Sequence, residues 1–220
     1  MGVEPARRRG LADEVADRIR DAIFAGTYPA GEQLREVELA GALDVSRGPV
    51  REALRLLERE GLVHVAWHRG ATVTTLSARD VAELDSLRGV LEELAVCEVA
   101  TRASDDDFAA IDKAADAMRR AVDPHELVWC DIVFHDAVFA ASHHRRLIEA
   151  WEGIRRQVHL FLLARIGRSI EGYLESIPAE HRELAAALRT RDATFAGPLF
   201  AEHRRKAFDV LTLGNAAARS

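Results

Sequence analysis

The chain has 220 residues and a formal net charge of −6, with 48% hydrophobic and 30% charged residues. This length suits one large domain or two modest ones with packed cores, and the negative charge argues against a protein that coats nucleic acid. No apolar run approaches the roughly eighteen residues of a membrane-spanning helix, and the N-terminus lacks the apolar segment of a signal peptide. We therefore expect a cytoplasmic protein that has no membrane partner.

The first ten residues contain three consecutive arginines, Arg7 to Arg9, and show no periodic apolar pattern. This composition predicts a flexible basic arm over residues 1–10. Apolar residues at helical spacing then begin at Leu11 and end before Gly26, a residue type that commonly terminates helices. The pattern predicts a first amphipathic helix after the arm.

Two short helices are predicted next, joined by a brief turn at Asp44 and Val45. The second begins after Ser46, a residue type that often caps helix N-termini, and stops at Gly61. Two helices joined so closely form the helix-turn-helix pattern, whose second helix lies in the DNA major groove. One face of this second helix is apolar and another carries a stripe of arginines. The stripe consists of Arg47, Arg51 and Arg55.

The residues after Gly61 alternate like two strands, over 62–65 and 71–74. The segment from Trp67 to Gly70 lies between them, so the pattern predicts a β-hairpin, or wing. The first 76 residues carry 11 Lys and Arg against 12 Asp and Glu. DNA binding by this part of the chain must therefore depend on arginines gathered on one side, because its net charge is not positive.

A new helix is predicted from Ser77, where Asp80 completes a Ser-x-x-Asp capping box. Several helix-start signals follow and no strand-like alternation does. Residues 77–217 therefore predict an all-α domain of about six helices, with the domain boundary near residues 75–77.

Four side chains of metal-binding type lie on apolar helix faces in this second domain. Asp131 and His135 are four residues apart, so both side chains reach one spot on a helix, and His181 and His203 lie in the same way on two later helices. Each alone would more often be a buried hydrogen-bonding group, but together they favour a shared divalent metal ion. One carboxylate and three imidazoles suit zinc best, with nickel, manganese or iron as alternatives, and suit calcium poorly.

Arg88 lies in the middle of another apolar stripe, between Leu84 and Leu91. A buried guanidinium needs an anionic partner. That partner is either Glu92, one helical turn further on, or the carboxylate of an acidic effector that enters the domain. The sequence leaves both interpretations open.

The N-terminal pattern resembles the winged helix-turn-helix of the GntR family of transcription regulators. The matching residues are Gly26, Pro29, Gly31, Leu34-Arg35-Glu36, Leu39-Ala40, Val45-Ser46-Arg47, Pro49 to Leu54, Leu57, Glu60-Gly61-Leu62 and Arg69-Gly70-Ala71. The second domain resembles the FCD domain, the all-helical effector-binding module of the FadR-type GntR subfamily, through its D-x-x-F-H … H … H pattern. The residues of that pattern are Asp131 to His135, Glu180-His181 and Glu202-His203.

The resemblance implies a mostly α-helical protein with a winged helix-turn-helix over residues 11–76, made of three helices and a β-hairpin. A bundle of about six helices over residues 77–217 would bind an effector and a metal ion and would form the dimer. In metal-binding members of the family the matched positions hold a divalent cation. The implied ligands are Asp131, His135, His181 and His203.

The implied function is that of a ligand-responsive regulator, a repressor that binds a short palindromic operator in double-stranded DNA as a homodimer. A small organic acid that contacts Arg88 would modulate its affinity for DNA. Arginine can grip guanine with two hydrogen bonds, so Arg47 and Arg51 are the candidates for base edges or adjacent phosphates. The other candidate DNA contacts are Arg35, Ser46 and Arg55 to the backbone, and Arg69 with Gly70 in the wing.

Two alternatives accompany this hypothesis. The metal ion could itself be the effector, or an open metal site could activate water in a metallohydrolase. The hydrolase needs a general base beside the metal, and no HExxH-type spacing occurs. The chain also departs from the FCD pattern twice: His143-His144 stand where an asparagine is usual, and Gly197-Pro198 is expected to interrupt the helix that carries His203.

Overall fold

The computed structural model describes residues 10–66, 70–166 and 173–217. The chain divides into two compact units, Met1–Thr75 and Leu76–Ser220. The predicted basic arm, apart from Gly10, and the wing residue Arg69 lie outside the described residues.

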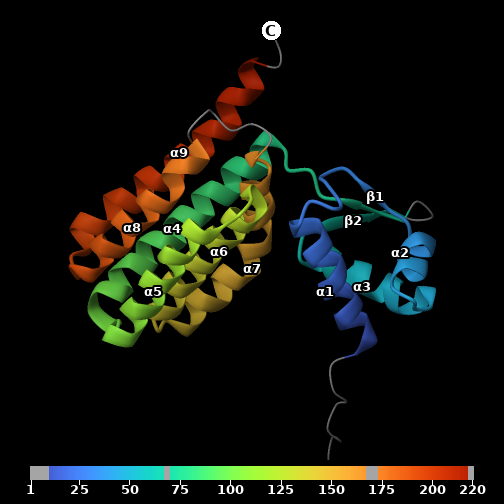
Figure 1. Ribbon diagram of the computed structural model, residues 1–220, viewed down its shortest axis with the longest axis horizontal. Helices are drawn as coiled ribbons and strands as arrows, with labels where there is room; N and C mark the ends of the chain where they lie inside the picture. The colour runs from blue at the N-terminus through green and yellow to red at the C-terminus, as the bar shows by residue number, and fades with distance from the viewer. Residues whose placement is uncertain (1–9, 67–69, 167–172, 218–220) are drawn as a thin grey trace, which may run out of the picture. The chain divides into compact units, whose positions relative to one another are not determined.

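The described residues of the first unit form three helices, as predicted: α1 (Leu11–Phe24), α2 (Glu36–Ala42) and α3 (Arg47–Arg59) (Figure 1). The apolar face of α1 packs against that of α3, and Ile19 and Leu57 are fully buried there. The turn between α2 and α3 passes through Asp44 at φ +52°, a left-handed conformation that aspartate tolerates better than most residues. Gly61, at φ +74°, follows the end of α3. The helix-turn-helix thus has the boundaries that its cap and turn residues indicate.

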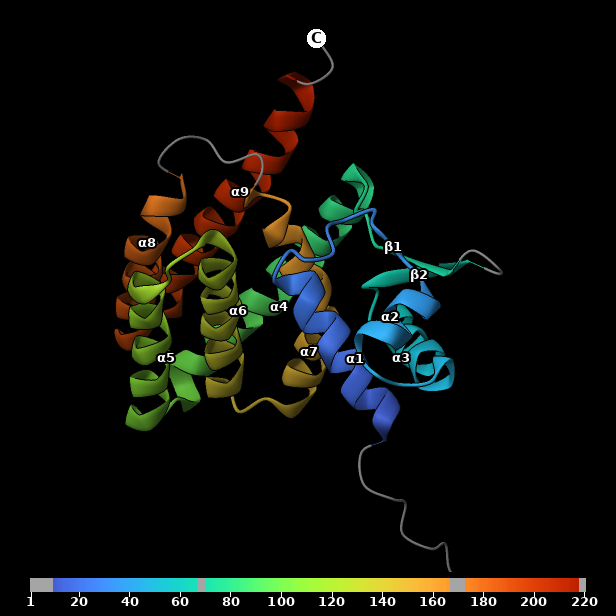
Figure 2. The ribbon, with the colours of Figure 1, turned by 45° about the vertical axis from the view of Figure 1, so that its right-hand side comes forward.

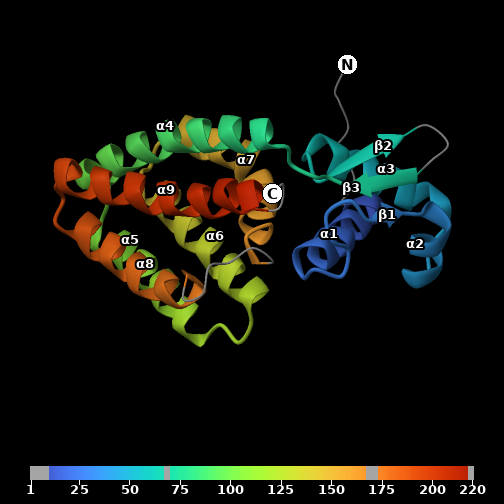
Figure 3. The same cartoon turned by 90° about the horizontal axis from the view of Figure 1, so that it is seen from above.

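Three short strands form an antiparallel sheet in the order β1-β3-β2, in which β1 is Gln33–Leu34, β2 is Val63–Ala66 and β3 is Gly70–Val73 (Figure 3). The pairing of β2 with β3 confirms the predicted hairpin. Strand β1 was not predicted, because two residues are too few to show an alternating pattern. A Cβ at Gly70 would lie 2.9 Å from the carbonyl oxygen of Leu34, so only glycine fits where β3 begins beside β1.

The second unit is all-helical within the described residues, and its six α-helices confirm the predicted fold class. They are α4 (Ala78–Arg102), α5 (Asp105–Ala117), α6 (Pro124–Ala141), α7 (Arg145–Leu163), α8 (Tyr173–Arg189) and α9 (Ala193–Ala217), with a 3₁₀ turn at Met118–Arg120. Helix α4 packs against α6, α7, α8 and α9, and Figure 2 shows α5 lying beside α6. Ser77 caps α4 by accepting a hydrogen bond from the Asp80 backbone N–H, as the capping box predicts.

The expected interruption at Gly197-Pro198 is wrong, because α9 is helical from Ala193 to Ala217. Pro198 is exposed and lies in the second turn of the helix, so its missing N–H removes a single hydrogen bond near the helix start. His203 keeps its place one to two turns further along the same helix.

The core of the second unit is mostly apolar over the described residues. Phe139 and Trp151 stack with ring centroids 4.5 Å apart, and Ile132 and Val99 are completely buried in the same core. Charged and imidazole side chains are buried within this core. They are Arg88, Glu92, Asp131, His135, His159, Arg165, His181 and His203. Within the described part of the chain, none of the helices combines the length and the apolar composition that a membrane span requires.

Candidate functional site

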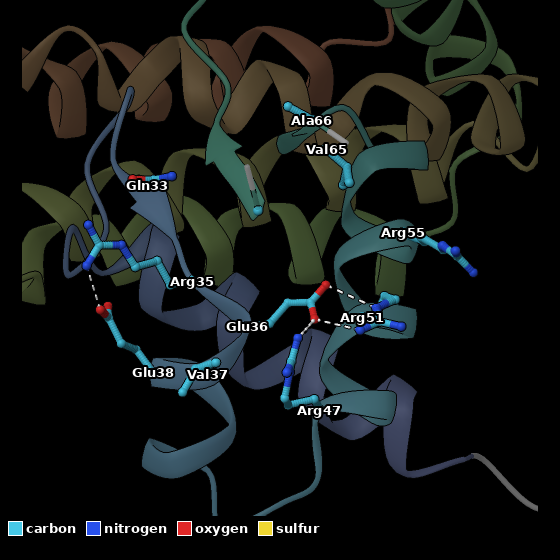
Figure 4. A pocket seen from close by; sticks show the side chains of 11 residues that line it. Gln33, Arg35, Glu36, Val37, Glu38, Arg47, Arg51, Arg55, Val65 and Ala66 are labelled. Carbon is cyan, nitrogen blue, oxygen red and sulfur yellow. Dashed lines mark hydrogen bonds and ion pairs between the residues drawn. The ribbon is translucent and has the colours of Figure 1, made fainter. Parts of the chain in front are cut away.

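A groove of about 890 Å³ lies on the first unit and brings together residues from β1, α2, α3 and the hairpin (Figure 4). Its lining residues are Gln33, Arg35, Glu36, Val37, Glu38, Arg47, Arg51, Arg55, Val65, Ala66 and Gly70. Five of the predicted DNA-contacting residues are therefore gathered here. Ser46 occupies the N-cap position of α3 and is exposed, but its hydroxyl makes no capping hydrogen bond.

Glu36 is the anionic centre of this groove. Its carboxylate accepts hydrogen bonds from Nε and Nη2 of Arg51, at 3.1 and 3.0 Å, and from Nη2 of Arg47 at 3.5 Å. The hydrogen bonds from Arg51 lower the pKa of Glu36 below its ordinary value. Both arginines predicted to read bases are thus held by one carboxylate in the free protein.

The other groove arginines are placed differently. Arg35 donates a hydrogen bond to Glu38 at 2.9 Å, and both side chains are well exposed. The Arg55 side chain extends away from Glu36 (Figure 4). Sequence reasoning missed Glu36 and also Val37, whose side chain is 65% exposed in the groove rather than packed in the core. The partners of Glu36 lie 11 and 15 residues away in the chain, so no local spacing reveals them.

The four predicted metal ligands converge in the second unit, where α6 supplies two of them and α8 and α9 supply one each. One ligand atom from each of Asp131, His135, His181 and His203 lies within 4.8 Å of the others, and all four residues are buried. Phe134 packs edge-on against the rings of His135 and His181, with centroids 5.4 and 4.8 Å away. The apolar neighbour excludes water from one side of the cluster.

Hydrogen bonds at Nδ1 orient two of the three imidazoles. His181 Nδ1 lies 2.8 Å from the backbone oxygen of Ile177, which can only accept, so Nδ1 carries a proton and Nε2 is the nitrogen that faces the other ligands. That Nε2 lies 3.7 Å from Asp131 Oδ1. Partners of this kind fix the tautomer and ring orientation of a metal-binding histidine.

His203 is held in the same way by an acid. Its Nδ1 lies 3.0 Å from Glu180 Oε2, and the hydrogen bond from His203 lowers the pKa of Glu180 to about 2. Burial lowers the pKa of His203 to about 4, so the ring is neutral near pH 7 and its Nδ1–H donates to the carboxylate. Its Nε2 lone pair is then the one available to a cation.

His135 differs because both of its ring nitrogens have charged neighbours. Nε2 lies 2.7 Å from Nη2 of Arg88, and because a guanidinium only donates, Nε2 accepts this hydrogen bond. Nδ1 lies 3.1 Å from Glu92 Oε1, although without the alignment of a hydrogen bond. Burial raises the pKa of Glu92, but the charge and hydrogen-bond contributions of Arg88 and His135 together outweigh it and hold that pKa at about 2.

Arg88 has an internal partner, which was one of the two possibilities that the sequence left open. Its Nε donates to Glu92 Oε1 at 2.8 Å, and both side chains are 2% exposed. Sequence reasoning missed a second buried guanidinium, Arg165, whose Nη2 lies 3.6 Å from Asp131 Oδ2. Burial raises the pKa of Asp131, but its histidine neighbours and Arg165 hold that pKa well below the ordinary range.

The cluster is suited to a divalent cation because several of its buried polar atoms lack hydrogen-bond partners among the described residues. Both carboxylate oxygens of Asp131 and Nε2 of His181 are buried and make no hydrogen bond among the described residues. Burying such groups unsatisfied costs about 1–3 kcal/mol each. A cation among one oxygen and three nitrogen donors would satisfy them, and this donor set suits a first-row transition metal better than calcium.

The other histidines in the second unit lie outside this cluster. His143 contacts Asp107 at 2.8 Å on the surface, and His144 accepts a hydrogen bond from the Leu147 backbone to cap α7. His159 is buried beside Trp129, with ring centroids 5.9 Å apart.

Comparison with known proteins agrees with both halves of the structure. Residues 11–73 match "Bacterial regulatory proteins, gntR family" and residues 83–206 match "FCD domain". The chain is 31% identical over 202 residues to the "Probable D-xylose utilization operon transcriptional repressor" of Paenarthrobacter nicotinovorans, covering 89% of this chain and 84% of the relative. It is 28% identical over 193 residues to the gluconate operon transcriptional repressor of Bacillus licheniformis, covering 84% and 78%.

A solved structure agrees over nearly the whole chain. The GntR transcriptional regulator from Rhodococcus sp. RHA1 superimposes with a TM-score of 0.77 at 30% identity, covering 91% of this chain and 97% of that one. These matches assign the protein to a class of regulators rather than enzymes, which excludes the metallohydrolase alternative. The chain belongs to the GntR family of DNA-binding transcription regulators, and its C-terminal FCD domain places it in the FadR subfamily.

Proposed function

We propose that this protein is a repressor that binds a short palindromic operator as a homodimer and is released by a small organic acid. The observation that carries the proposal is the pairing of an arginine-lined groove in one unit with a buried cluster of cation ligands in the other. Two of its relatives are named as repressors of gluconate and D-xylose operons, which supports repression and a response to metabolites.

In the proposed complex, α3 enters the major groove and presents Arg47 and Arg51 to base edges. Exposed Val37 is suited to contact a thymine methyl group, since it stands 65% exposed in the same groove. Contacts to the DNA sugar-phosphate backbone come from the remaining arginines and from the hydroxyl at the N-cap position of α3, which makes no capping hydrogen bond. These residues are Arg35, Ser46, Arg55 and, with Gly70 in the wing, Arg69, which lies outside the described residues.

A homodimer follows from the need to grip two half-sites of a palindrome, and α4 offers a surface for it. Leu87, Val90 and Leu94 lie at helical spacing on α4 and are 47%, 66% and 40% exposed. Exposed apolar side chains arranged along one helix face commonly mark a protein interface. We infer that a second copy of the chain covers this face.

The second unit receives the signal in this proposal. Asp131, His135, His181 and His203 would hold a divalent cation, zinc before nickel, manganese or iron. Such an ion would act as a Lewis acid that attracts the carboxylate of an organic acid. Arg88 would hold the same carboxylate through its guanidinium donors. The acid can change DNA binding only if it binds two arrangements of the protein, the DNA-binding one and another, with different affinities.

A metal-responsive regulator is the second candidate. Arg88 already donates to Glu92 through Nε and to His135 through Nη2, so its charge has protein partners without any organic acid. In this case the cation alone changes the affinity for DNA.

Operator binding by chelator-treated protein tests both candidates. We expect fluorescence anisotropy to show nanomolar binding to a palindrome upstream of the protein's own gene, and loss of that binding in the Arg47→Ala, Arg51→Ala double variant. Zn²⁺ with a panel of sugar acids and carboxylic acids then separates the mechanisms. Release by Zn²⁺ alone supports metal sensing, release that also needs an acid supports the repressor proposed here, and equal binding by wild type and double variant contradicts both.

A further inference from the structure

The hydrogen bond between Arg88 and His135 occupies an atom that a metal ion would need. His135 Nε2 accepts from Arg88 Nη2 at 2.7 Å, and the same Nε2 lies 3.4 Å from Asp131 Oδ1. The other ring nitrogen, Nδ1, faces Glu92 at 3.1 Å instead. Nε2 is therefore the nitrogen that His135 directs toward the other ligands of the cluster.

An imidazole nitrogen has one lone pair, which cannot accept a hydrogen bond from Arg88 and bind a cation at the same time. We infer that the Arg88 guanidinium and a divalent cation compete for His135 Nε2, so that Arg88 occupies this ligand in the cation-free protein and sets the affinity of the site. The inference rests on the metal site proposed above. It adds that the arginine weakens cation binding rather than supporting it.

The contacts of Arg88 allow such an exchange without loss of its ion pair. Its Nε is bonded to Glu92 at 2.8 Å, close to the stem of the side chain, whereas the competing contact is made by the outer Nη2. Its Nη1 is buried and makes no hydrogen bond within the described part of the chain. A guanidinium that leaves His135 while keeping Glu92 would direct two Nη donors to a new acceptor, as binding of a carboxylate requires.

Cation loading and acid binding are coupled by this exchange. Before loading, Nη2 is engaged by His135. After loading, it is released for an anion beside the cation. The acid is therefore expected to bind the loaded protein more tightly, and by reciprocity to tighten the cation.

The test is the Zn²⁺ affinity of metal-stripped protein, measured by competition with a chromophoric chelator. Removing a competing charge-assisted hydrogen bond is expected to tighten binding by about tenfold or more in Arg88→Gln. Arg204→Gln is the matched control, because Arg204 is also a cation beside Glu92, with Nη1 3.8 Å from Oε2, and its ion-pair partners among the described residues are the carboxylates of Asp85 and Glu92. We expect a gain of less than about threefold in the control.

A second measurement controls for misfolding of the variant, since Arg88→Gln leaves the buried Glu92 without its ion-pair partner Arg88. The double variant Arg88→Gln, Glu92→Gln removes both charges together and should also bind Zn²⁺ more tightly than Glu92→Gln alone. In wild-type protein, stoichiometric Zn²⁺ should shift the guanidinium NMR signals of Arg88, assigned with Arg88→Lys, and leave those of Arg155 in place.

The possible outcomes distinguish failure of the proposed metal site from failure of the competition between Arg88 and the cation. Wild-type protein that binds no Zn²⁺, or binds it equally after His135→Ala, overturns the metal site itself. Zn²⁺ binding that depends on His135 but is equal or weaker in Arg88→Gln overturns the competition alone. An equal gain in Arg204→Gln also overturns it, because charge repulsion would then explain the whole effect.

Discussion

Arg51 donates two hydrogen bonds to the carboxylate of Glu36, from Nε at 3.1 Å and from Nη2 at 3.0 Å. The two carboxylate oxygens thus receive the same fork of donors that arginine uses to grip O6 and N7 of guanine. Glu36 also lies 3.5 Å from Nη2 of Arg47, so it restrains both arginines at the start of α3. The Arg51 guanidinium is therefore ordered before DNA binds. It must give up its hydrogen bonds to Glu36 before it can bind a base.

Replacing Glu36 should therefore weaken discrimination between sequences. In Glu36→Gln we expect affinity for a scrambled duplex to rise more than affinity for the operator, because Arg47 and Arg51 become free to reach any phosphate. Fluorescence anisotropy with both duplexes at two salt concentrations measures the ratio. Glu38→Gln is the control, since it removes the same charge from the same helix but pairs with Arg35. An equal change of the ratio in both variants would show that charge alone matters.

Mutation of an arginine that contacts a base and mutation of one that contacts the DNA backbone should change DNA affinity in different ways. Arg51→Ala is expected to cost about 1–3 kcal/mol of operator binding and to relax specificity at one base position. Arg55→Ala should weaken operator and scrambled DNA alike and lower the slope of log affinity against log salt by about one. Salt titrations of both variants distinguish these roles. An equal loss of affinity for operator and scrambled DNA in Arg51→Ala would show that Arg51 contacts the DNA backbone instead.

Zinc should stabilise the second unit if its buried ligands hold the ion. At free Zn²⁺ one hundred times the dissociation constant, the unfolding free energy should rise by about 2.7 kcal/mol. Differential scanning calorimetry with Zn²⁺, and again after excess chelator, measures this shift. His181→Ala should abolish it, whereas His143→Ala should keep it, because His143 lies on the surface against Asp107. A shift of equal size in both variants would place the ion elsewhere.

The buried ring of His159 should make the protein less stable in acid. Burial, followed by the charge of Arg155, lowers the pKa of His159 from 6.5 to about 4. The unfolded state therefore binds this proton first, so stability is complete above pH 6.5 and is lost as the pH falls toward 4. The shift corresponds to roughly 3 kcal/mol.

Urea unfolding of wild type and His159→Gln between pH 4 and pH 8 checks this prediction. The variant should lose less stability than wild type below pH 6.5, and the two curves should run parallel above pH 7. Parallel curves over the whole range would mean that His159 does not titrate on unfolding.

The exposed face of α4 predicts the effect of one charged substitution. Val90→Glu places a carboxylate on a side chain that is 66% exposed in the single chain, so it should disrupt the dimer while leaving the fold intact. Analytical ultracentrifugation should show a monomer, and operator affinity should fall by at least tenfold. Val122→Glu is the matched control, because Val122 is 87% exposed outside this face. A dimer in both variants would locate the interface elsewhere.

The local pattern of the chain determined its helices and the list of candidate cation ligands. Ser46 and Gly61 bound α3 because caps and stops depend on neighbouring residues. Asp131 and His135 could be paired from the sequence because residues four apart in a helix share a face. Apolar periodicity likewise indicated that His181 and His203 point inward.

Only the tertiary structure decided which groups act on one another. Glu36 meets Arg51 across 15 residues and Arg88 meets His135 across 47, and neither pairing has a local periodicity that would reveal it. The position of Arg165 beside Asp131 likewise depends on how α6 and α7 pack. Helix formation is set by short-range hydrogen bonds and caps, whereas the partners of a buried charge are set by the packing of helices distant in sequence.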